Sequence, residues 1–165
     1  MSKSMDTICI RDSTICVHGK EHAVKDQNYA ISYPIYQTAS FSHLTPGHNP
    51  NGFDYTRESN PTRSLLEETV SALEGACDTV AFASGMAAVA AVFEYFKPRD
   101  HVICSEDLYG GVVRLAAVIS AKNNIEVEYV DTSDLQALKA AVRENTKAIY
   151  FETPTNPMMH VTDIR

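Results

Sequence analysis

From Pro61 onward, apolar segments of strand type alternate with segments of helical type, and this alternation restricts the possible folds more than any other feature of the chain. Helices are expected at residues 61–74, 85–96, 111–122 and 134–145, and strands at 79–84, 101–105, 125–131 and 147–152. Strands that are separated by helices favour parallel pairing with crossover connections. The sequence therefore predicts the α/β class, with a mostly parallel sheet flanked by helices.

Two of these helices have recognisable start signals. Asn60 and Pro61 are a favoured N-cap and first-turn pair for the helix at 61–74, and Gly75 is a natural stop. Ser133 and Gln136 have the spacing of a capping box for the fourth helix.

Residues 1–60 lack sustained periodicity and are rich in His, Asn, Ser, Tyr and Pro. A long irregular segment is uncommon in a compact domain unless it has a function or packs on a partner. We therefore expect residues 1–60 to form an extended N-terminal arm and residues 61–165 to belong to a single α/β domain.

Charge and cysteine usage exclude several classes of protein. The formal net charge of −7 argues against nucleic-acid or anionic-membrane partners. The longest N-terminal apolar run is too short for a signal peptide or a membrane span. The four cysteines form no CxxC pair, which indicates reduced thiols and a cytoplasmic location.

Ligands of open α/β sheets bind beyond the carboxyl ends of the strands, and three loops there carry distinctive residues. In ASGMAA, Gly85 and Met86 start a helix directly after a strand, which suits either an anion site or a plain tight turn. In EDLYGG, Tyr109 either stacks on a planar ligand or packs on the surface. In ETPTNP, Asn156 either makes a directed hydrogen bond or serves as a turn residue.

A metal site is the alternative of a different class. HGKEH, at residues 18–22, matches the H-x-x-E-H pattern in which two histidines on one helix bind zinc. Gly19 interrupts the pattern and the region has no helical stripe, so we expect a polar arm segment and no metal.

The strings YPIYQTASF, DYTRESNPTR, LEG, ASGMAA, EDLYGG and ETPTNP, followed by the aspartate of TDI, occur in one order along nearly the whole chain. In this set and order the chain resembles the N-terminal part of the Cys/Met-metabolism (trans-sulfuration) family of pyridoxal-phosphate enzymes. The resemblance implies a fold-type I large domain, pyridoxal 5'-phosphate as cofactor and a sulfur amino acid as substrate. It also implies a homo-oligomer, a dimer of dimers.

The resemblance also implies roles for particular residues. Tyr55 and Arg57 would reach across a dimer interface to the cofactor phosphate of the neighbouring subunit, and the backbone of Gly85 and Met86 would bind the same phosphate. Tyr109 would stack on the pyridine ring and assist proton transfer. Asn156 would hydrogen-bond the phenolic oxygen of the ring. Arg63 would be an ordinary helix residue.

One family feature is missing. The cofactor needs a Schiff-base lysine, and none of Lys3, Lys20, Lys25, Lys97, Lys122, Lys139 and Lys147 lies in a predicted strand-end loop. Members of the family are more than twice as long as this chain. We therefore expect a fragment that is inactive by itself. Residues 61–165 would be the first half of the cofactor-binding domain, and the rest of that domain and the C-terminal domain would be absent. A non-catalytic role as a partner-binding chain is the alternative.

The reaction stays open within the family. The expectation is a cystathionine γ-lyase-like elimination at the γ-carbon, and the alternatives are a cystathionine γ-synthase, another γ-replacement enzyme or a methionine γ-lyase. In methionine γ-lyases the residue after Tyr-Gly is typically cysteine. Gly111 at that position favours the cystathionine enzymes.

Overall fold

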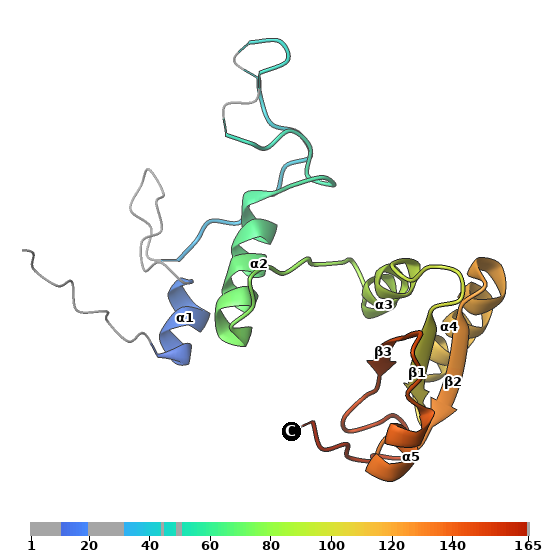
Figure 1. Cartoon of the computed structure of the whole chain (residues 1–165). Helices are drawn as coiled ribbons and strands as arrows, with labels where there is room; N and C mark the ends of the chain where they lie inside the picture. Colours follow the sequence, from blue (N-terminus) through green and yellow to red (C-terminus); the bar gives the residue numbers. More distant parts are fainter. Residues whose placement is uncertain (1–10, 20–31, 44, 49–50, 165) are drawn as a thin grey trace, which may run out of the picture. The chain divides into compact units, whose positions relative to one another are not determined.

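The computed structural model describes residues 11–19, 32–43, 45–48 and 51–164 (Figure 1). The backbone separates into two compact units, residues 1–81 and residues 82–165. We call them the first and the second unit and describe each by itself.

Among its described residues, the first unit has two helices, α1 (Asp12–His18) and α2 (Pro61–Glu74). The predicted start and stop of α2 are confirmed. The Asn60 side chain accepts a hydrogen bond from the Thr62 N–H, and Gly75 adopts the left-handed conformation at φ 63°. Helix α1 was not predicted, and it packs on α2: a Cβ added to Gly19 would lie 3.2 Å from Leu65 Cδ1.

Between these helices the described residues of the first unit are mostly irregular, as expected. It folds back on itself through an isolated antiparallel bridge between Ser40 and Tyr55. Two backbone hydrogen bonds support the bridge, from Phe41 N to Asp54 O at 2.8 Å and from Thr56 N to Ala39 O at 2.9 Å. The boundary between the two units lies after residue 81, so α2 belongs to the first unit, whereas the arm was predicted over residues 1–60. The role of this arm toward a neighbouring subunit stays a prediction.

The second unit is an α/β structure, which confirms the predicted fold class. Its elements in chain order are α3 (Gly85–Glu94), β1 (His101–Ser105), α4 (Gly110–Asn123), β2 (Glu126–Val130), α5 (Leu135–Ala141) and β3 (Thr146–Tyr150). The sheet has the order β2-β1-β3, and both strand pairs are parallel (Figure 1).

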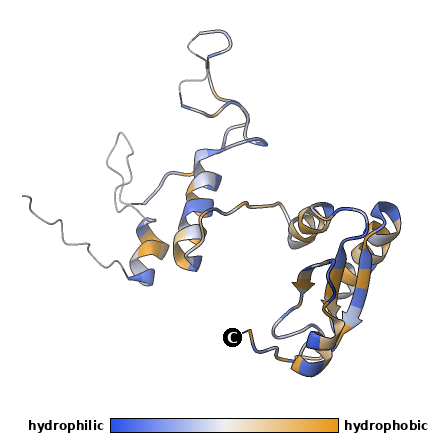
Figure 2. Cartoon of the chain, in the orientation of Figure 1, coloured by the Kyte–Doolittle hydropathy of each residue, from blue (hydrophilic) through white to orange (hydrophobic). Residues whose placement is uncertain are grey.

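The hydrophobic core lies between the sheet and helices α3 and α4. It consists of Phe93, Val102, Cys104, Leu108, Val112, Ala116, Ile119 and Ile125. The central strand β1 is buried along its whole length, as expected for a parallel strand with both faces covered. Strand β2 contains both hydrophilic and hydrophobic residues, as Figure 2 shows.

Two predictions of local structure were wrong. Residues 79–84 are not a strand, and Val80 and Phe82 are exposed. A strand requires a paired neighbour, and none lies beside this segment in the part of the chain that the structure describes. The capping box at Ser133 is also wrong: the Asp134 carboxylate caps α5 by accepting from Gln136 N and Ala137 N, while the Ser133 hydroxyl donates to Asp131 at 2.6 Å.

Candidate functional site

The carboxyl ends of β1, β2 and β3 meet at one edge of the sheet, because all three strands are parallel. Residues 106–109, 131–134 and 151–164 follow these ends. The loop after β2 has a structural role, since its buried Thr132 hydroxyl lies 2.8 Å from the Thr162 hydroxyl and 3.4 Å from that of Ser105. The other two loops carry the predicted ligands Tyr109 and Asn156.

The N-terminus of α3 has two backbone donors to offer. The Ser84 side chain caps the helix by accepting from Ala87 N at 3.2 Å. The N–H groups of Gly85 and Met86 have no acceptor among the described residues, and a Cβ added to Gly85 would meet no atom within 4 Å. Free donors, open space and the positive end of the helix dipole together fit a phosphate group.

The Tyr109 ring and the Met86 side chain both lie close to the backbone of Gly111. A Cβ built on Gly111 would lie 2.5 Å from Tyr109 Cε1 and 3.1 Å from Met86 Sδ. The Tyr109 ring and the Met86 side chain therefore share the space that a side chain at position 111 would need. The ring is 48% exposed, so one side of it remains available to a ligand.

Two carboxylates hold the Tyr109 loop and the Asn156 loop together. The backbone N–H of Tyr109 donates to both oxygens of Glu152, each at 3.2 Å. In the opposite direction, Asp107 accepts from the Thr155 hydroxyl and from Met158 N, the latter at 3.1 Å. We call these two contacts the loop clasp. Sequence reasoning did not single out Asp107 or Glu152, although each lies within four residues of a predicted ligand.

Asn156 is exposed, and no hydrogen bond of its amide is formed with a described residue. Its neighbour Thr155 is 2% exposed and accepts from His160 N at 2.8 Å. The peptide bonds Thr153–Pro154 and Asn156–Pro157 are cis. The amide is therefore presented from a loop whose backbone is fixed by Thr155 and the loop clasp.

Tyr55 and Arg57 lie in the first unit, at the bridge that closes the irregular segment on itself. The guanidinium carbon of Arg57 lies 5.0 Å from the centroid of the Tyr55 ring. No carboxylate pairs with Arg57 within the described ranges, so its donors are available to an anion. These two residues form a pair of their own, while Gly85, Met86, Tyr109 and Asn156 belong to the second unit.

Arg63 is not the ordinary helix residue that was expected. It lies in the first turn of α2, and its guanidinium donates to the carbonyl oxygens of Thr56, Arg57 and Glu58. Sequence reasoning missed this role, because it depends on the path of the preceding turn.

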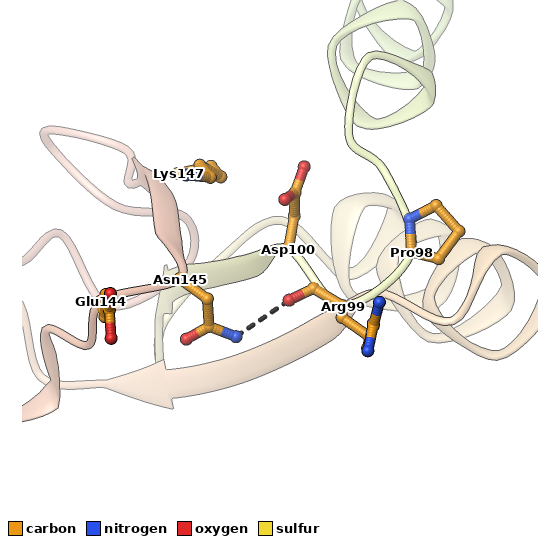
Figure 3. A pocket seen from close by; sticks show the side chains of 6 residues that line it. All are labelled: Pro98, Arg99, Asp100, Glu144, Asn145 and Lys147. Carbon is orange, nitrogen blue, oxygen red and sulfur yellow. Dashed lines mark hydrogen bonds between the residues drawn. The ribbon is translucent and has the colours of Figure 1, made fainter.

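None of the lysines that the structure describes lies in the loops at the carboxyl edge of the sheet. Lys147 lies within β3 and Lys97 follows α3. Lys3, Lys20 and Lys25 lie outside the described residues. Lys147 instead lines a hollow beside the amino ends of β1 and β3 (Figure 3).

This hollow is lined by Pro98, Arg99, Asp100, Glu144, Asn145 and Lys147. The Asn145 amide closes one side of it by donating to Arg99 O at 2.9 Å, the dashed line in Figure 3. It lies at the edge of the sheet opposite to the ligand loops. Its side chains are mostly exposed and of mixed charge, so it is not the candidate site.

The helical zinc pattern at residues 18–22 is not formed as a continuous helix. Helix α1 ends at His18, and Gly19 has φ 74° and ψ −177°. Glu21 and His22 lie outside the described residues. No group of three or more metal-ligating side chains was found among the residues for which side chains are described.

None of the helices in the described ranges is long and apolar enough to span a membrane.

Comparison with known proteins gives a consistent result. The family model for Cys/Met metabolism PLP-dependent enzymes matches residues 13–165. A cystathionine beta-lyase of Lactococcus lactis subsp. cremoris (strain MG1363) is 46% identical over 82% of this chain and 36% of its own length. A cystathionine gamma-lyase of Bacillus subtilis (strain 168) is 40% identical over 94% of this chain and 40% of its own length.

A solved structure agrees with these relatives. The cystathionine gamma-lyase from Lactobacillus plantarum, complexed with L-serine, has a TM-score of 0.80 at 40% identity, over 93% of this chain and 39% of that chain. The predicted fold-type I architecture is confirmed by this similarity. The chain spans less than half the length of each of these three proteins.

Proposed function

This chain belongs to the family of Cys/Met metabolism PLP-dependent enzymes, and from that membership we propose that it forms one side of a pyridoxal-phosphate site that cleaves a carbon–sulfur bond. The substrate class is a sulfur amino acid of the cystathionine type. The observation that carries the proposal is the free donor pair at the N-terminus of α3, with the Tyr109 ring beside Met86.

The residues of the second unit have complementary tasks in this proposal. The N–H groups of Gly85 and Met86 bind the phosphate, and the exposed face of the Tyr109 ring stacks on the pyridine. The Asn156 amide donates to the phenolic oxygen of the ring. The bound cofactor supplies an electron sink for the amino acid, and the Tyr109 hydroxyl holds or transfers a proton at the departing sulfur.

Tyr55 and Arg57 complete the phosphate site of a neighbouring subunit in this proposal. An arginine fork suits phosphate oxygens, and Arg57 has no competing carboxylate among the described residues. The arrangement requires a homo-oligomer, which we propose to be a dimer of dimers. It assigns residues 1–60 the role of an arm toward the partner.

The lysine that binds the cofactor covalently would come from outside these 165 residues. We use the term holoenzyme for the PLP-loaded assembly that contains this chain and that lysine. A reducing cytoplasm is its proposed location, in keeping with the free thiols of Cys16, Cys77 and Cys104.

The proposed reaction is elimination at the γ-carbon of cystathionine, and elimination at the β-carbon is the second candidate. The β-lyase was not among the sequence-based alternatives, and the 46% identity to a lactococcal cystathionine beta-lyase supports it. The two reactions cut different carbon–sulfur bonds. Cleavage at the γ-carbon leaves cysteine and a four-carbon keto acid, whereas cleavage at the β-carbon leaves homocysteine and pyruvate.

The test is to give the holoenzyme cystathionine and to identify both the thiol and the keto acid. Release of cysteine and the four-carbon keto acid would support γ-elimination, and release of homocysteine and pyruvate would support β-elimination instead.

The Tyr109→Phe variant keeps the ring face but loses the hydroxyl, so turnover should fall by about 10²–10⁴-fold while PLP stays bound. Release of neither thiol by a PLP-loaded wild type would refute carbon–sulfur cleavage of cystathionine.

A further inference from the structure

Arg63 holds the turn that carries Arg57. Its Nη1 donates to Thr56 O at 3.3 Å and to Arg57 O at 3.4 Å, and its Nη2 donates to Glu58 O. Three consecutive carbonyl groups therefore converge on one guanidinium. A planar group with donors in a fixed fork fixes the orientation of these peptides as well as their distance.

The guanidinium of Arg63 is itself held in place. Its Nε lies 3.6 Å from Glu67 Oε1, one helical turn further along α2. The same Glu67 oxygen accepts from Ala81 N at 2.8 Å. Both side chains are partly buried, at 32% and 21% exposure, so the ion pair is partly shielded from solvent. Arg63 thus projects from a rigid helix in a defined orientation.

The turn has few other internal contacts. Glu58 N and Ser59 N both donate to Tyr55 O, at 2.9 and 3.0 Å. The Thr56 hydroxyl donates to Thr38 O, and the Asn60 amide donates to that hydroxyl oxygen at 3.1 Å. These contacts fix the two ends of the turn. The carbonyl groups of Arg57 and Glu58, in its middle, are held by Arg63.

Arg63 is poorly suited to bind an anion directly. Its Nη1 and Nη2 are bonded to carbonyl oxygens, and its Nε faces a carboxylate. The Arg57 guanidinium, by contrast, contacts the Tyr55 ring and no carboxylate of the described chain. The two arginines six residues apart therefore have different tasks.

We propose that Arg63 is a positioning residue that fixes the backbone of residues 56–58, so that Arg57 and Tyr55 are held in place for an anionic phosphate group. The inference rests on the proposed function for the identity of that phosphate. It adds a residue outside the Tyr-x-Arg pair to the determinants of phosphate binding, and it assigns to Glu67 the support of Arg63.

The first test needs only the 165-residue chain. Arg63→Lys keeps the charge and the helix propensity but cannot reach three carbonyl groups at once. Hydrogen exchange at the amides of Glu58 and Ser59 should become about tenfold faster or more. The reason is that loss of a charge-assisted hydrogen bond shifts the opening equilibrium of the turn by about that factor. The amide of Ser71 inside α2 should exchange as in the wild type, and so should all three amides in the control Arg143→Lys. Unchanged exchange at Glu58 and Ser59 would overturn the proposal.

The second test compares pyridoxal phosphate with pyridoxal, which lacks the phosphate, in the holoenzyme. Arg63→Lys should weaken binding of the phosphorylated form by about tenfold and leave that of pyridoxal unchanged. In an Arg57→Ala background the same substitution should add less than about twofold, because a residue that acts through another is not additive with it. An equal loss for both ligands, or full additivity, would show that Arg63 acts in another way.

The two tests separate the inference from the function on which it rests. If the wild type bound pyridoxal phosphate no better than pyridoxal, the proposed phosphate site would be wrong. The exchange result would still decide whether Arg63 holds the turn.

Discussion

Gly111 illustrates how a residue without a side chain shapes a site. The Tyr109 ring and the Met86 sulfur atom occupy the space where a Cβ would lie. From the sequence, this glycine served only to distinguish members of the family by the residue after Tyr-Gly. In the structure it allows the ring to lie against the first turn of α4.

We therefore predict that Gly111→Ala displaces the Tyr109 ring. The added Cβ would lie 2.5 Å from Tyr109 Cε1, so the ring must move. In the holoenzyme, turnover should fall toward that of Tyr109→Phe, and a crystal structure should show the ring rotated. Gly110→Ala is the matched control, because its Cβ would meet only the flexible Arg114 Nη1, at 3.4 Å. Equal turnover in the two variants would contradict this account of Gly111.

Cys104 leads to a prediction about pH. Burial in the core raises the pKa of its thiol from 9.0 to about 11. The unfolded chain releases this proton near pH 9 while the folded chain keeps it, so the stabilisation is complete below pH 9 and is lost as pH rises toward 11. Two pKa units correspond to roughly 2–3 kcal/mol in the free energy of unfolding.

The measurement for Cys104 is urea unfolding of the chain between pH 8 and pH 11. Burial also raises the pKa of Tyr129 and Tyr150, which act in the same direction at higher pH. Cys104→Ala should therefore reduce the loss of stability between pH 9 and pH 10 and leave a loss above pH 10. A variant with the same slope as the wild type between pH 9 and pH 10 would exclude the thiol as its cause.

At the scale of the elements, α5 shows which of several candidate residues serves as the N-cap of a helix. The segment DTSD offers several residues that can cap a helix. The Asp134 carboxylate accepts from Gln136 N at 2.8 Å and from Ala137 N at 3.2 Å. Ser133 bonds to Asp131 instead, and these hydrogen bonds lower the pKa of the Asp131 carboxyl. Asp131 and Ser133 thus form a turn of their own before the helix.

Asp134→Ala should accordingly destabilise the chain by about 1 kcal/mol, the usual contribution of an N-cap. Ser133→Ala is the matched control one residue earlier and should have less than half that effect, since its hydroxyl caps no helical N–H. Both values come from urea unfolding at neutral pH. A larger loss of stability in Ser133→Ala than in Asp134→Ala would support the capping box that the sequence predicted.

Elements with strong periodicity or a continuous apolar run were predictable from the sequence, and elements that depend on distant neighbours were not. Strand β1 is fully buried and α2 has both caps in its own sequence, so their signals are local. Residues 79–84 have the composition of a strand, but composition does not supply a paired neighbour. Helix α1 has only seven residues, too few for a clear stripe.

The same distinction applies to the candidate site. Tyr109 and Asn156 follow from their place in loops after predicted strands, and their roles stay predictions. Gly85 and Met86 were predicted to follow a strand at 79–84 that is not formed, and they begin helix α3. Their roles also stay predictions. Asp107, Glu152 and Arg63 act through contacts that the sequence alone does not place, because they depend on the path of the backbone. Asp107, for example, accepts from Thr155, 48 residues away.

At the scale of the whole molecule, none of the described lysines belongs to the candidate site. The three proteins reported above have 36–40% of their length matched by this chain. Apolar side chains such as Val80, Tyr95 and Val118 are more than 60% exposed.

We predict that the 165-residue chain alone retains no stoichiometric pyridoxal phosphate. An exposed lysine reacts with the free cofactor only weakly, because nothing positions the amine against the aldehyde, and no described lysine lies in a ligand loop. The test is to add the cofactor, remove the excess by desalting and record the visible spectrum, with cystathionine as substrate in parallel. A persistent stoichiometric absorbance of bound cofactor, or release of keto acid and ammonia, would show that the chain is sufficient by itself.

The loop clasp has a consequence for the order of folding. Its contacts join residues that are 43 to 51 positions apart, on either side of α4, β2, α5 and β3. Contacts of such long range form only after the entropy of closing the intervening chain has been overcome. The Tyr109 loop and the Asn156 loop should therefore become ordered late, once β1 and β3 have found their register. A chain whose strands are paired in the wrong register would present neither ligand loop in its final form, so the candidate site becomes competent only in molecules whose sheet is correctly assembled.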